Sequence, residues 1–136
     1  MKLKKNQSGF TLLEIIIVII IIGILASIAL PKFFKTVEYS RSSEALANLG
    51  TIRRSMDICY QSERTYAGCN DWNKLFLTDP GSQTGALFSY SFPSLTATAF
   101  TILATRTTVQ GGTSADTISI DQNGAKVGTG AFVNIQ

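Results

Sequence analysis

A nearly continuous apolar stretch dominates the first part of the chain. It runs from Phe10 to Leu30 and contains one charged residue, Glu14. A helix of this length reaches about 31 Å, which matches the roughly 30 Å hydrocarbon core of a bilayer. The pattern therefore predicts a helix that can cross a membrane, followed by about 105 residues that form one small domain.

Beyond Pro31 the apolar residues recur at every third or fourth position, which is typical of one face of a helix. This helix is predicted to continue to about Gln61 and to pack on a sheet through that face. A proline inside a helix removes one backbone hydrogen bond and clashes with the preceding turn, so a kink or a loosened stretch is expected at Pro31, with a simple bend as the alternative. The apolar positions are Ala45, Leu49, Ile52, Met56, Cys59 and Tyr60, and the opposite side carries Arg41, Glu44, Arg53 and Arg54.

From Tyr66 onward the composition changes to Gly, Thr, Ser and short apolar alternations, and an irregular connection with a turn signal at 79–81 precedes the expected strands. The apolar alternations predict strands at 86–92, 97–106 and 116–121, and a further short strand at 131–135. The dipeptide Asn123-Gly124 is a strong signal for a two-residue hairpin leading into the segment AKVG. The expected fold is α+β, with a long N-terminal helix packed on an antiparallel sheet of three or four strands.

The basic residues are unevenly placed. The formal charge is +3, but Lys2, Lys4 and Lys5 lie in the first nine residues, and the remaining chain has nine basic and nine acidic residues. Lysines in front of an apolar helix place that end in the cytoplasm and the rest of the chain across the membrane. Lys32 and Lys35 on the far side weaken this asymmetry without reversing it.

The two cysteines, Cys59 and Cys69, both follow the apolar stretch. Disulfides persist in exported regions, so we expect these two residues to be paired. Closing a loop of this size stabilises a domain by about 3 kcal/mol. Two free buried thiols are the alternative.

Glu14 does not fit the two simplest interpretations of the N-terminal segment. A secretory signal would place its cleavage site near the small residues at 27–29, but its apolar core is usually shorter, at about 7–15 residues. A plain membrane anchor gains nothing from an acid that costs roughly 2.5–3.5 kcal/mol at the centre of a membrane helix. A third interpretation begins from Gly9, the small residue immediately before the apolar stretch.

The leader MKLKKNQSG is followed by FTLLEIIIVIIIIGILASIALP. Together these two segments closely resemble the N-terminus of type IV prepilins and of the related type II secretion pseudopilins. The resemblance implies that a membrane-bound prepilin peptidase cuts after Gly9, methylates the new N-terminal amine of Phe10 and leaves the apolar helix on the protein. It further implies that the Glu14 carboxylate of an incoming subunit pairs with the Phe10 amine of its neighbour in a filament.

Pairing of Glu14 with the amine of its own Phe10, one helical turn away, is the alternative at this site. The resemblance also implies that the stretch between Gly23 and Pro31 can lose helicity when the filament forms.

No catalytic constellation is found in the sequence. It contains no histidine, and no Ser or Cys lies in a recognisable nucleophile motif, so the protein is predicted not to be an enzyme. No cofactor or metal is expected, because the segment 121–124 resembles only part of a calcium loop. Nucleic acid is disfavoured as a partner, because the chain after the leader is formally neutral and offers no broad basic field.

The predicted function is that of a structural subunit, a major or minor pilin, that polymerises into a type IV pilus. The expected parts are a leader peptide at 1–9, a hydrophobic transmembrane and filament-core helix at 10–31, and a pilin globular domain at 32–136. A pseudopilin of a type II secretion system is the alternative, although the loop ERTYAGCNDW lacks the Tyr-Pro segment usual in the major pseudopilin. A membrane-anchored binding module is a further alternative.

The expected partners follow from this function. They are other copies of the chain, other pilins or pseudopilins, prepilin peptidase, an inner-membrane assembly platform and membrane lipid. Before assembly the chain is expected to be a single-pass inner-membrane protein with a cytoplasmic N-terminus, and after assembly part of an extracellular or periplasmic filament.

Overall fold

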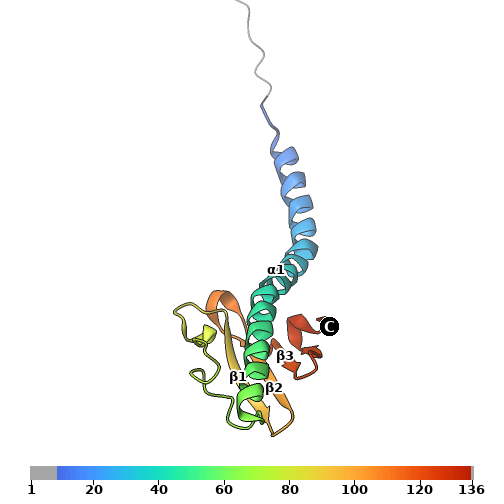
Figure 1. Cartoon of the computed structure of the whole chain (residues 1–136). Coiled ribbons are helices and arrows are strands. Elements are labelled where there is room, and N and C mark those ends of the chain that lie inside the picture. The colour runs from blue at the N-terminus through green and yellow to red at the C-terminus, as the bar shows by residue number, and fades with distance from the viewer. Residues whose placement is uncertain (1–8, 136) are drawn as a thin grey trace, which may run out of the picture. The chain divides into compact units, whose positions relative to one another are not determined.

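The computed structural model describes residues 9–135 (Figure 1). The chain divides into two compact units between Lys35 and Thr36. One helix, α1 (Leu12–Glu63), contributes to both units. It begins and ends two residues later than the pattern predicts.

The first unit consists of the beginning of α1. Among the described residues, α1 is the helix that is long and apolar enough to cross a membrane, with a mean hydropathy of 3.1 over its most apolar window and none of that window buried. The helix is continuous through Gly23 and Pro31. A helix that is apolar on every side needs lipid or other helices around it, so the exposed surface of this unit has to be covered by one or the other.

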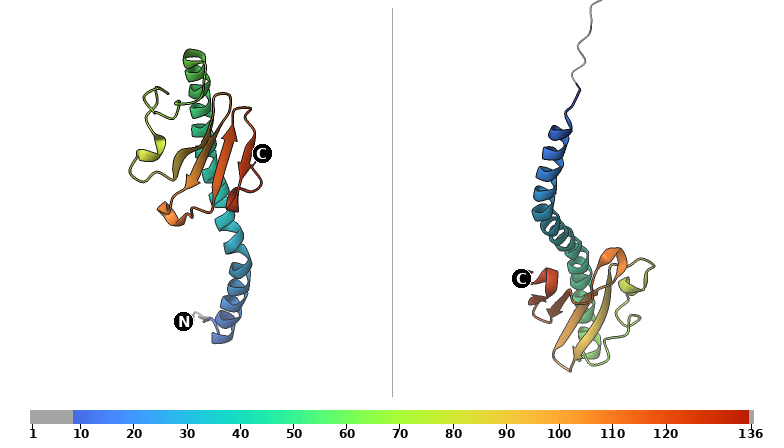
Figure 2. Two further views of the ribbon diagram at one scale, coloured as in Figure 1. Left: turned by 90° about the horizontal axis from the view of Figure 1, so that it is seen from below. Right: turned by 180° about the vertical axis from the view of Figure 1, so that it is seen from behind.

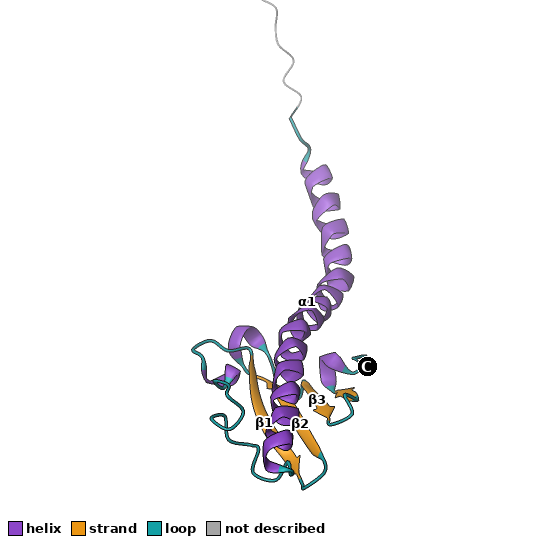
Figure 3. Cartoon of the chain, viewed as in Figure 1, coloured by secondary structure: helices purple, strands orange, loops and turns teal. Residues whose placement is uncertain are grey.

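In the second unit, the remainder of α1 lies on one face of a four-stranded antiparallel sheet (Figures 1 and 3). The strands are β1 (Phe88–Leu95), β2 (Phe100–Arg106), β3 (Thr117–Asp121) and β4 (Lys126–Gly128), side by side in chain order (Figure 2). Pro93 lies where the β1–β2 register shifts, on an edge strand, where a missing N–H is tolerated. The α+β fold expected from the sequence is confirmed.

The core lies between α1 and the sheet. Every second side chain of β2, from Phe100 to Arg106, is buried, and β3 buries Ile118 and Ile120 in the same way. The helix contributes the face predicted from its three- and four-residue spacing. Of that face, Ala45, Leu49, Ile52, Met56 and Cys59 are buried and Tyr60 is half-buried. The helical and strand periodicities were therefore sufficient to find the two halves of the core.

The strand predicted at 131–135 is wrong. The chain forms a single 3-10 turn there, η3 (Gly130–Phe132), and Phe132 and the following Ile135 are buried while Val133 between them is exposed. The buried positions are three apart, which suits a helical turn and not a strand. The buried carboxylate of Asp116 fixes the turn, because its Oδ1 accepts a hydrogen bond of 2.8 Å from the Ala131 N–H.

The β3–β4 hairpin forms where Asn123-Gly124 predicts it, but its connection is longer than two residues. The Asp121 N–H donates to the Ala125 carbonyl at 3.1 Å, which leaves residues 122–124 as the loop. Only Gly124 has a left-handed backbone, with φ of 85°, whereas a two-residue type I′ turn requires positive φ at both positions. The Asp121 side chain supports the longer loop by accepting from the N–H groups of Asn123 and Ala125.

Candidate assembly site

The helix begins with a reciprocal cap made by Thr11 and Glu14. The Glu14 N–H donates to Thr11 Oγ1 at 3.2 Å, and the Thr11 N–H donates to Glu14 Oε2 at 3.0 Å. The Thr11 hydroxyl also donates to the same carboxylate oxygen, at 3.0 Å. The first N–H groups of a helix have no partner within it, so this capping box satisfies donors that the membrane could not.

Glu14 therefore has a partner before any processing takes place. In the unprocessed chain the nitrogen of Phe10 is part of the peptide bond with Gly9, so it carries no α-amino charge. Both residues precede the helix, and the side chain of Phe10 is 85% exposed. The structure thus describes the carboxylate held by Thr11, and its pairing with an amine stays a prediction. The Thr-x-x-Glu spacing in the sequence is the local pattern that predicts such a cap.

Gly23 and Pro31 lie inside the continuous helix of the first unit. A Cβ added at Gly23 would have no neighbour within 4 Å. Between the two residues, the Ser27 hydroxyl donates to the Ile24 carbonyl at 2.7 Å, a contact that draws on a backbone acceptor of the helix. The stretch is helical here, and its loosening in a filament stays a prediction.

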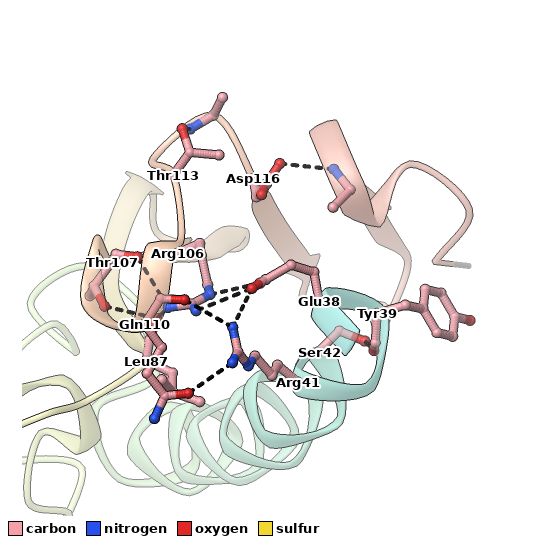
Figure 4. A network of polar contacts seen from close by, with 12 residues as sticks. Glu38, Tyr39, Arg41, Ser42, Leu87, Arg106, Thr107, Gln110, Thr113 and Asp116 are labelled. Carbon is pink, nitrogen blue, oxygen red and sulfur yellow. Dashed lines mark hydrogen bonds and ion pairs between the residues drawn. The ribbon is translucent and has the colours of Figure 1, made fainter. Parts of the chain in front are cut away.

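A buried arginine ties the second half of α1 to the sheet (Figure 4). The side chain of Arg106, at the end of β2, is fully buried, and its Nε donates to Glu38 Oε2 on α1 at 2.9 Å. Its Nη1 donates to the carbonyls of Leu87 and Thr107 at 3.0 and 3.1 Å. The guanidinium carbon also lies 5.7 Å from the centre of the Phe88 ring, within range of a cation–π contact. A buried charge is tolerated only with such partners.

Glu38 accepts from a second arginine as well. Arg41, one turn further along α1, donates to Glu38 Oε1, and its Nη2 donates to the side-chain oxygen of Gln110 at 2.8 Å (Figure 4). The hydrogen bond from Arg106 is the main cause that holds the pKa of Glu38 below its ordinary value of 4.5, with a smaller contribution from Arg41. Glu38 and Arg106 are 68 residues apart, and no local pattern in the sequence links them.

Gly112 leaves the space that the Arg106 side chain occupies. A Cβ at Gly112 would lie 2.5 Å from Cζ of Arg106 and 2.3 Å from the Thr107 carbonyl oxygen. Gly112→Ala is therefore expected to lower the free energy of unfolding by about 1–3 kcal/mol, because overpacking forces the neighbours to move. Urea unfolding of the purified chain in detergent measures this loss.

The matched control is Gly50→Ala on α1, where an added Cβ has no neighbour within 4 Å. That change is expected to raise the free energy of unfolding by roughly 0.5–1 kcal/mol, because alanine is the better helix former. Equal stability of the two variants would contradict the packing around Arg106.

The predicted disulfide joins Cys59, near the end of α1, to Cys69 in the following loop, with a Cα–Cα distance of 6.2 Å. Both residues are buried. Beside them, Lys74 and Glu63 form an exposed ion pair at 3.6 Å, and the side chain of Phe76 is 85% exposed. The disulfide thus joins the loop covalently to the last part of the helix.

Replacing both cysteines by alanine is expected to lower the free energy of unfolding by about 3 kcal/mol, because the unfolded chain regains the entropy of an open loop. Unfolding of the wild-type chain with and without a reductant gives the same comparison. The double variant should be insensitive to the reductant. A wild-type midpoint that does not move on reduction would show that the disulfide does not stabilise the domain.

No group of three or more His, Cys, Asp or Glu side chains within residues 9–135 is placed to hold a metal ion. In the segment that resembles part of a calcium loop, Asp121 Oδ1 already accepts two backbone N–H groups. The described residues at the start of α1 and around Arg106 form groups that are hydrogen-bonded and ion-paired within the chain.

Two family models match the chain, and together they cover most of it. A model described as the prokaryotic N-terminal methylation motif matches residues 4–30. A second model, described as the type IV minor pilin ComP, DNA uptake sequence receptor, matches residues 31–119. The first coincides with the apolar stretch and the cap at Thr11, and the second covers the rest of α1 and the strands as far as β3.

The curated relatives resemble the chain over about half of its length. The type IV major fimbrial protein FimA of Dichelobacter nodosus is 36% identical over 67 residues, which cover 49% of this chain and 43% of the relative. The type II secretion system core protein G of Aeromonas hydrophila is 38% identical over 55 residues, 40% of this chain and 38% of the relative. The chain therefore aligns with less than half of the length of either of these two relatives.

A solved structure supports the fold. The non-core minor pilin PilV of Neisseria meningitidis superimposes with a TM-score of 0.57 at 18% identity, over 71% of this chain and 90% of that chain. This likeness concerns the fold alone, whereas the second family model matches more than half of the sequence. The protein therefore belongs to the type IV pilin family, in the group whose model is described as the type IV minor pilin ComP, DNA uptake sequence receptor.

Proposed function

We propose that this protein is a non-catalytic structural subunit that is stored in the inner membrane and polymerises into a type IV pilus. The observation that carries the proposal is the methylation motif at 4–30, followed by a helix whose apolar side chains are exposed on every side and which continues into a pilin-family domain. That surface suits lipid before assembly and other helices afterwards. A head-to-tail contact repeated between copies produces an open filament.

Processing creates the group that assembly uses. In this proposal prepilin peptidase removes residues 1–9 by cutting after Gly9 and methylates the amine of Phe10. The Glu14 carboxylate of an incoming subunit then exchanges its Thr11 contacts for the charged amine of a neighbour's Phe10. The exchange is favourable because an ammonium and a carboxylate satisfy each other where neither could be left alone in an apolar environment.

The remaining parts have distinct roles in this proposal. Residues 10–31 cross the inner membrane with the N-terminus in the cytoplasm and later form part of the filament core, and residues 32–136 form the globular domain outside. Pro31 lacks the N–H that would bond to the preceding turn, so the helix between Gly23 and Pro31 is the place where it loosens as subunits pack together. An assembly platform in the inner membrane takes up the processed subunit.

The decisive experiment combines mass spectrometry with filament shearing. The mature protein is expected to have the mass of residues 10–136 plus one CH2, because a methyl group replaces one hydrogen of the amine, and less two hydrogens for the disulfide. Abundance of the chain in sheared surface filaments would identify a major pilin, and traces would identify a minor pilin. An unprocessed mass would remove the proposal.

A pseudopilin of a type II secretion system is the second candidate, because protein G of such systems is among the relatives. The relatives named protein G align with 40–59% of this chain, a share comparable to the 49% of the fimbrial protein FimA, so an experiment has to separate the two candidates. Absence of the chain from sheared filaments, together with a secretion defect on deletion, would favour this candidate.

DNA binding is a third candidate, because the family model over residues 31–119 is described as a DNA uptake sequence receptor. The charge of the domain opposes it: from Thr36 onward there are seven basic and eight acidic residues. Of the basic residues, Arg106 is buried and Arg53 donates to the Gln122 carbonyl at 3.1 Å. Gel retardation that weakens with salt would support DNA binding, and no retardation at low salt would remove it.

A further inference from the structure

The segment Lys32-Phe33-Phe34-Lys35 ends the first unit of the chain directly after the apolar stretch. All four residues are exposed on α1. The side chains of Phe33 and Phe34 are each 61% exposed, and their rings touch edge to face with centroids 6.0 Å apart. Two large aromatic side chains are thus exposed next to each other between two lysines, where the apolar part of α1 ends.

The position of this segment matches the edge of a bilayer. From Phe10 to residues 32–35 a helix extends roughly 33–38 Å, which lies just beyond a hydrocarbon core of about 30 Å. Aromatic rings are enriched at that level, and lysine stems lie along apolar surface while the ammonium groups reach the headgroups.

We propose that residues 32–35 form an interfacial anchor that binds lipid headgroup phosphates on the side of the bilayer that carries the globular domain. The proposal rests on the proposed storage of the subunit in the membrane. The two ammonium groups pair with phosphate oxygens, and the two rings lie among the glycerol and upper acyl groups. The partner is a phospholipid surface, because its negative phosphates lie directly above apolar chains and this segment combines two positive groups with two apolar rings.

The anchor has a consequence for assembly. It fixes the depth at which the helix is held, because sliding inward would carry both lysines into hydrocarbon and sliding outward would carry both rings into water. A subunit that leaves the membrane for a filament breaks these contacts at the same time as Glu14 finds its new partner.

Tryptophan reporters in the mature full-length chain test the anchor. Trp72 is the single tryptophan, so the background variant is Trp72→Phe. Separate reporters are Phe33→Trp and Phe34→Trp in the segment, Ile20→Trp in the middle of the apolar stretch, and Ser43→Trp on the exposed side of the domain helix. Each chain is reconstituted in vesicles of phosphatidylethanolamine and phosphatidylglycerol, and the depth is measured by quenching with lipids brominated at different acyl positions.

The reporters at 33 and 34 are expected to share one depth and to be quenched most by the bromine nearest the headgroups. Lys32→Gln together with Lys35→Gln is expected to move F33W toward the bilayer centre by roughly one helical turn, about 5 Å. The control pair Lys74→Gln and Lys126→Gln removes the same charge from the domain and should leave the depth unchanged.

Two results would overturn the anchor while leaving the membrane span intact. In both, I20W is quenched at the bilayer centre, but either F33W is as open to an aqueous quencher as S43W or the lysine variants leave its depth unchanged. A different result, in which I20W is not quenched by any lipid, would instead remove the membrane storage on which the anchor rests.

Discussion

Replacing Glu14 with alanine is expected to lower the yield of surface filaments by roughly tenfold or more, while processing and membrane insertion continue. The variant removes the only charge of the apolar stretch, so insertion becomes easier. It also leaves the charged amine of a neighbouring Phe10 without a partner in the filament core. A lost interaction of about 1.4 kcal/mol changes an equilibrium constant by a factor of ten. Sheared filaments and the mass of the membrane-bound subunit are the two measurements.

The variant is expected to leave the globular domain unchanged, because the hydrogen bonds of the Glu14 side chain are to Thr11, in the first unit of the chain. Urea unfolding of the domain should therefore match the wild type. Glu44→Ala, which removes an exposed acid elsewhere on α1, is the control and should assemble normally. Filaments of E14A at wild-type yield would show that the carboxylate has no pairing role.

In the proposed exchange, Thr11 and the amine of a neighbouring Phe10 compete for the Glu14 carboxylate. In the structure the carboxylate accepts two hydrogen bonds from Thr11, both through Oε2. Hydrogen bonds to a charged group each contribute about 1.5–3 kcal/mol. A neighbour's amine must therefore stabilise the carboxylate by more than the two hydrogen bonds of this cap do. A charged ammonium in an apolar environment can bind the carboxylate more strongly than Thr11 does, whereas a neutral peptide nitrogen cannot. Cleavage after Gly9 would therefore act as the step that makes assembly favourable.

The parts of the fold that could be predicted from the sequence are those with a local period. The apolar residues from Ala45 to Cys59 recur every three or four positions, and this spacing correctly predicted the buried face of α1. The alternation of apolar and polar residues predicted strands such as β2. The prediction failed for the last segment. AFVNI is apolar enough for a strand, but its turn is fixed by the hydrogen bond from Ala131 to Asp116, fifteen residues earlier. The hairpin loop was similarly lengthened by the Asp121 carboxylate.

The contacts around Arg106 could not be predicted, because their cause is tertiary. An arginine at the end of a strand ordinarily points to water, and only the approach of α1 gives it the Glu38 carboxylate. The two glycines of the segment at 111–112 read simply as a loop, although Gly112 leaves room for that guanidinium group. At the start of α1, by contrast, the spacing Thr-x-x-Glu is a local signal for the cap in which Glu14 hydrogen-bonds to Thr11.

Replacing Glu38 with glutamine is expected to lower the free energy of unfolding by about 3 kcal/mol, because it leaves the buried guanidinium of Arg106 without a countercharge. For a domain of this size the melting temperature falls by more than about 10 °C. Arg41→Gln is the control. Its side chain is 22% exposed and shares the same carboxylate, so its loss is expected to stay below about 1 kcal/mol.

The difference between wild type and E38Q should depend on pH with a definite sign. The pKa of Glu38 is lowered in the folded state by the hydrogen bond from Arg106, so between the folded and unfolded pKa values the unfolded chain binds more protons. The stabilisation is therefore complete well above the ordinary pKa of 4.5 and is lost as the pH falls below it, through the lowered value. Urea unfolding of both chains across this range should show the two stabilities converging toward low pH.

An apolar pair provides the last check on this interaction. Glu38→Leu combined with Arg106→Met leaves no charge buried, so the double variant is expected to lose less stability than the two single changes together. Strict additivity would mean that the two side chains do not interact in the folded protein. A stability difference that persists unchanged at pH values well below the ordinary pKa of Glu38 would mean that E38Q acts through packing and not through its charge. In either case the charge interaction between Glu38 and Arg106 would not be a source of the domain's stability.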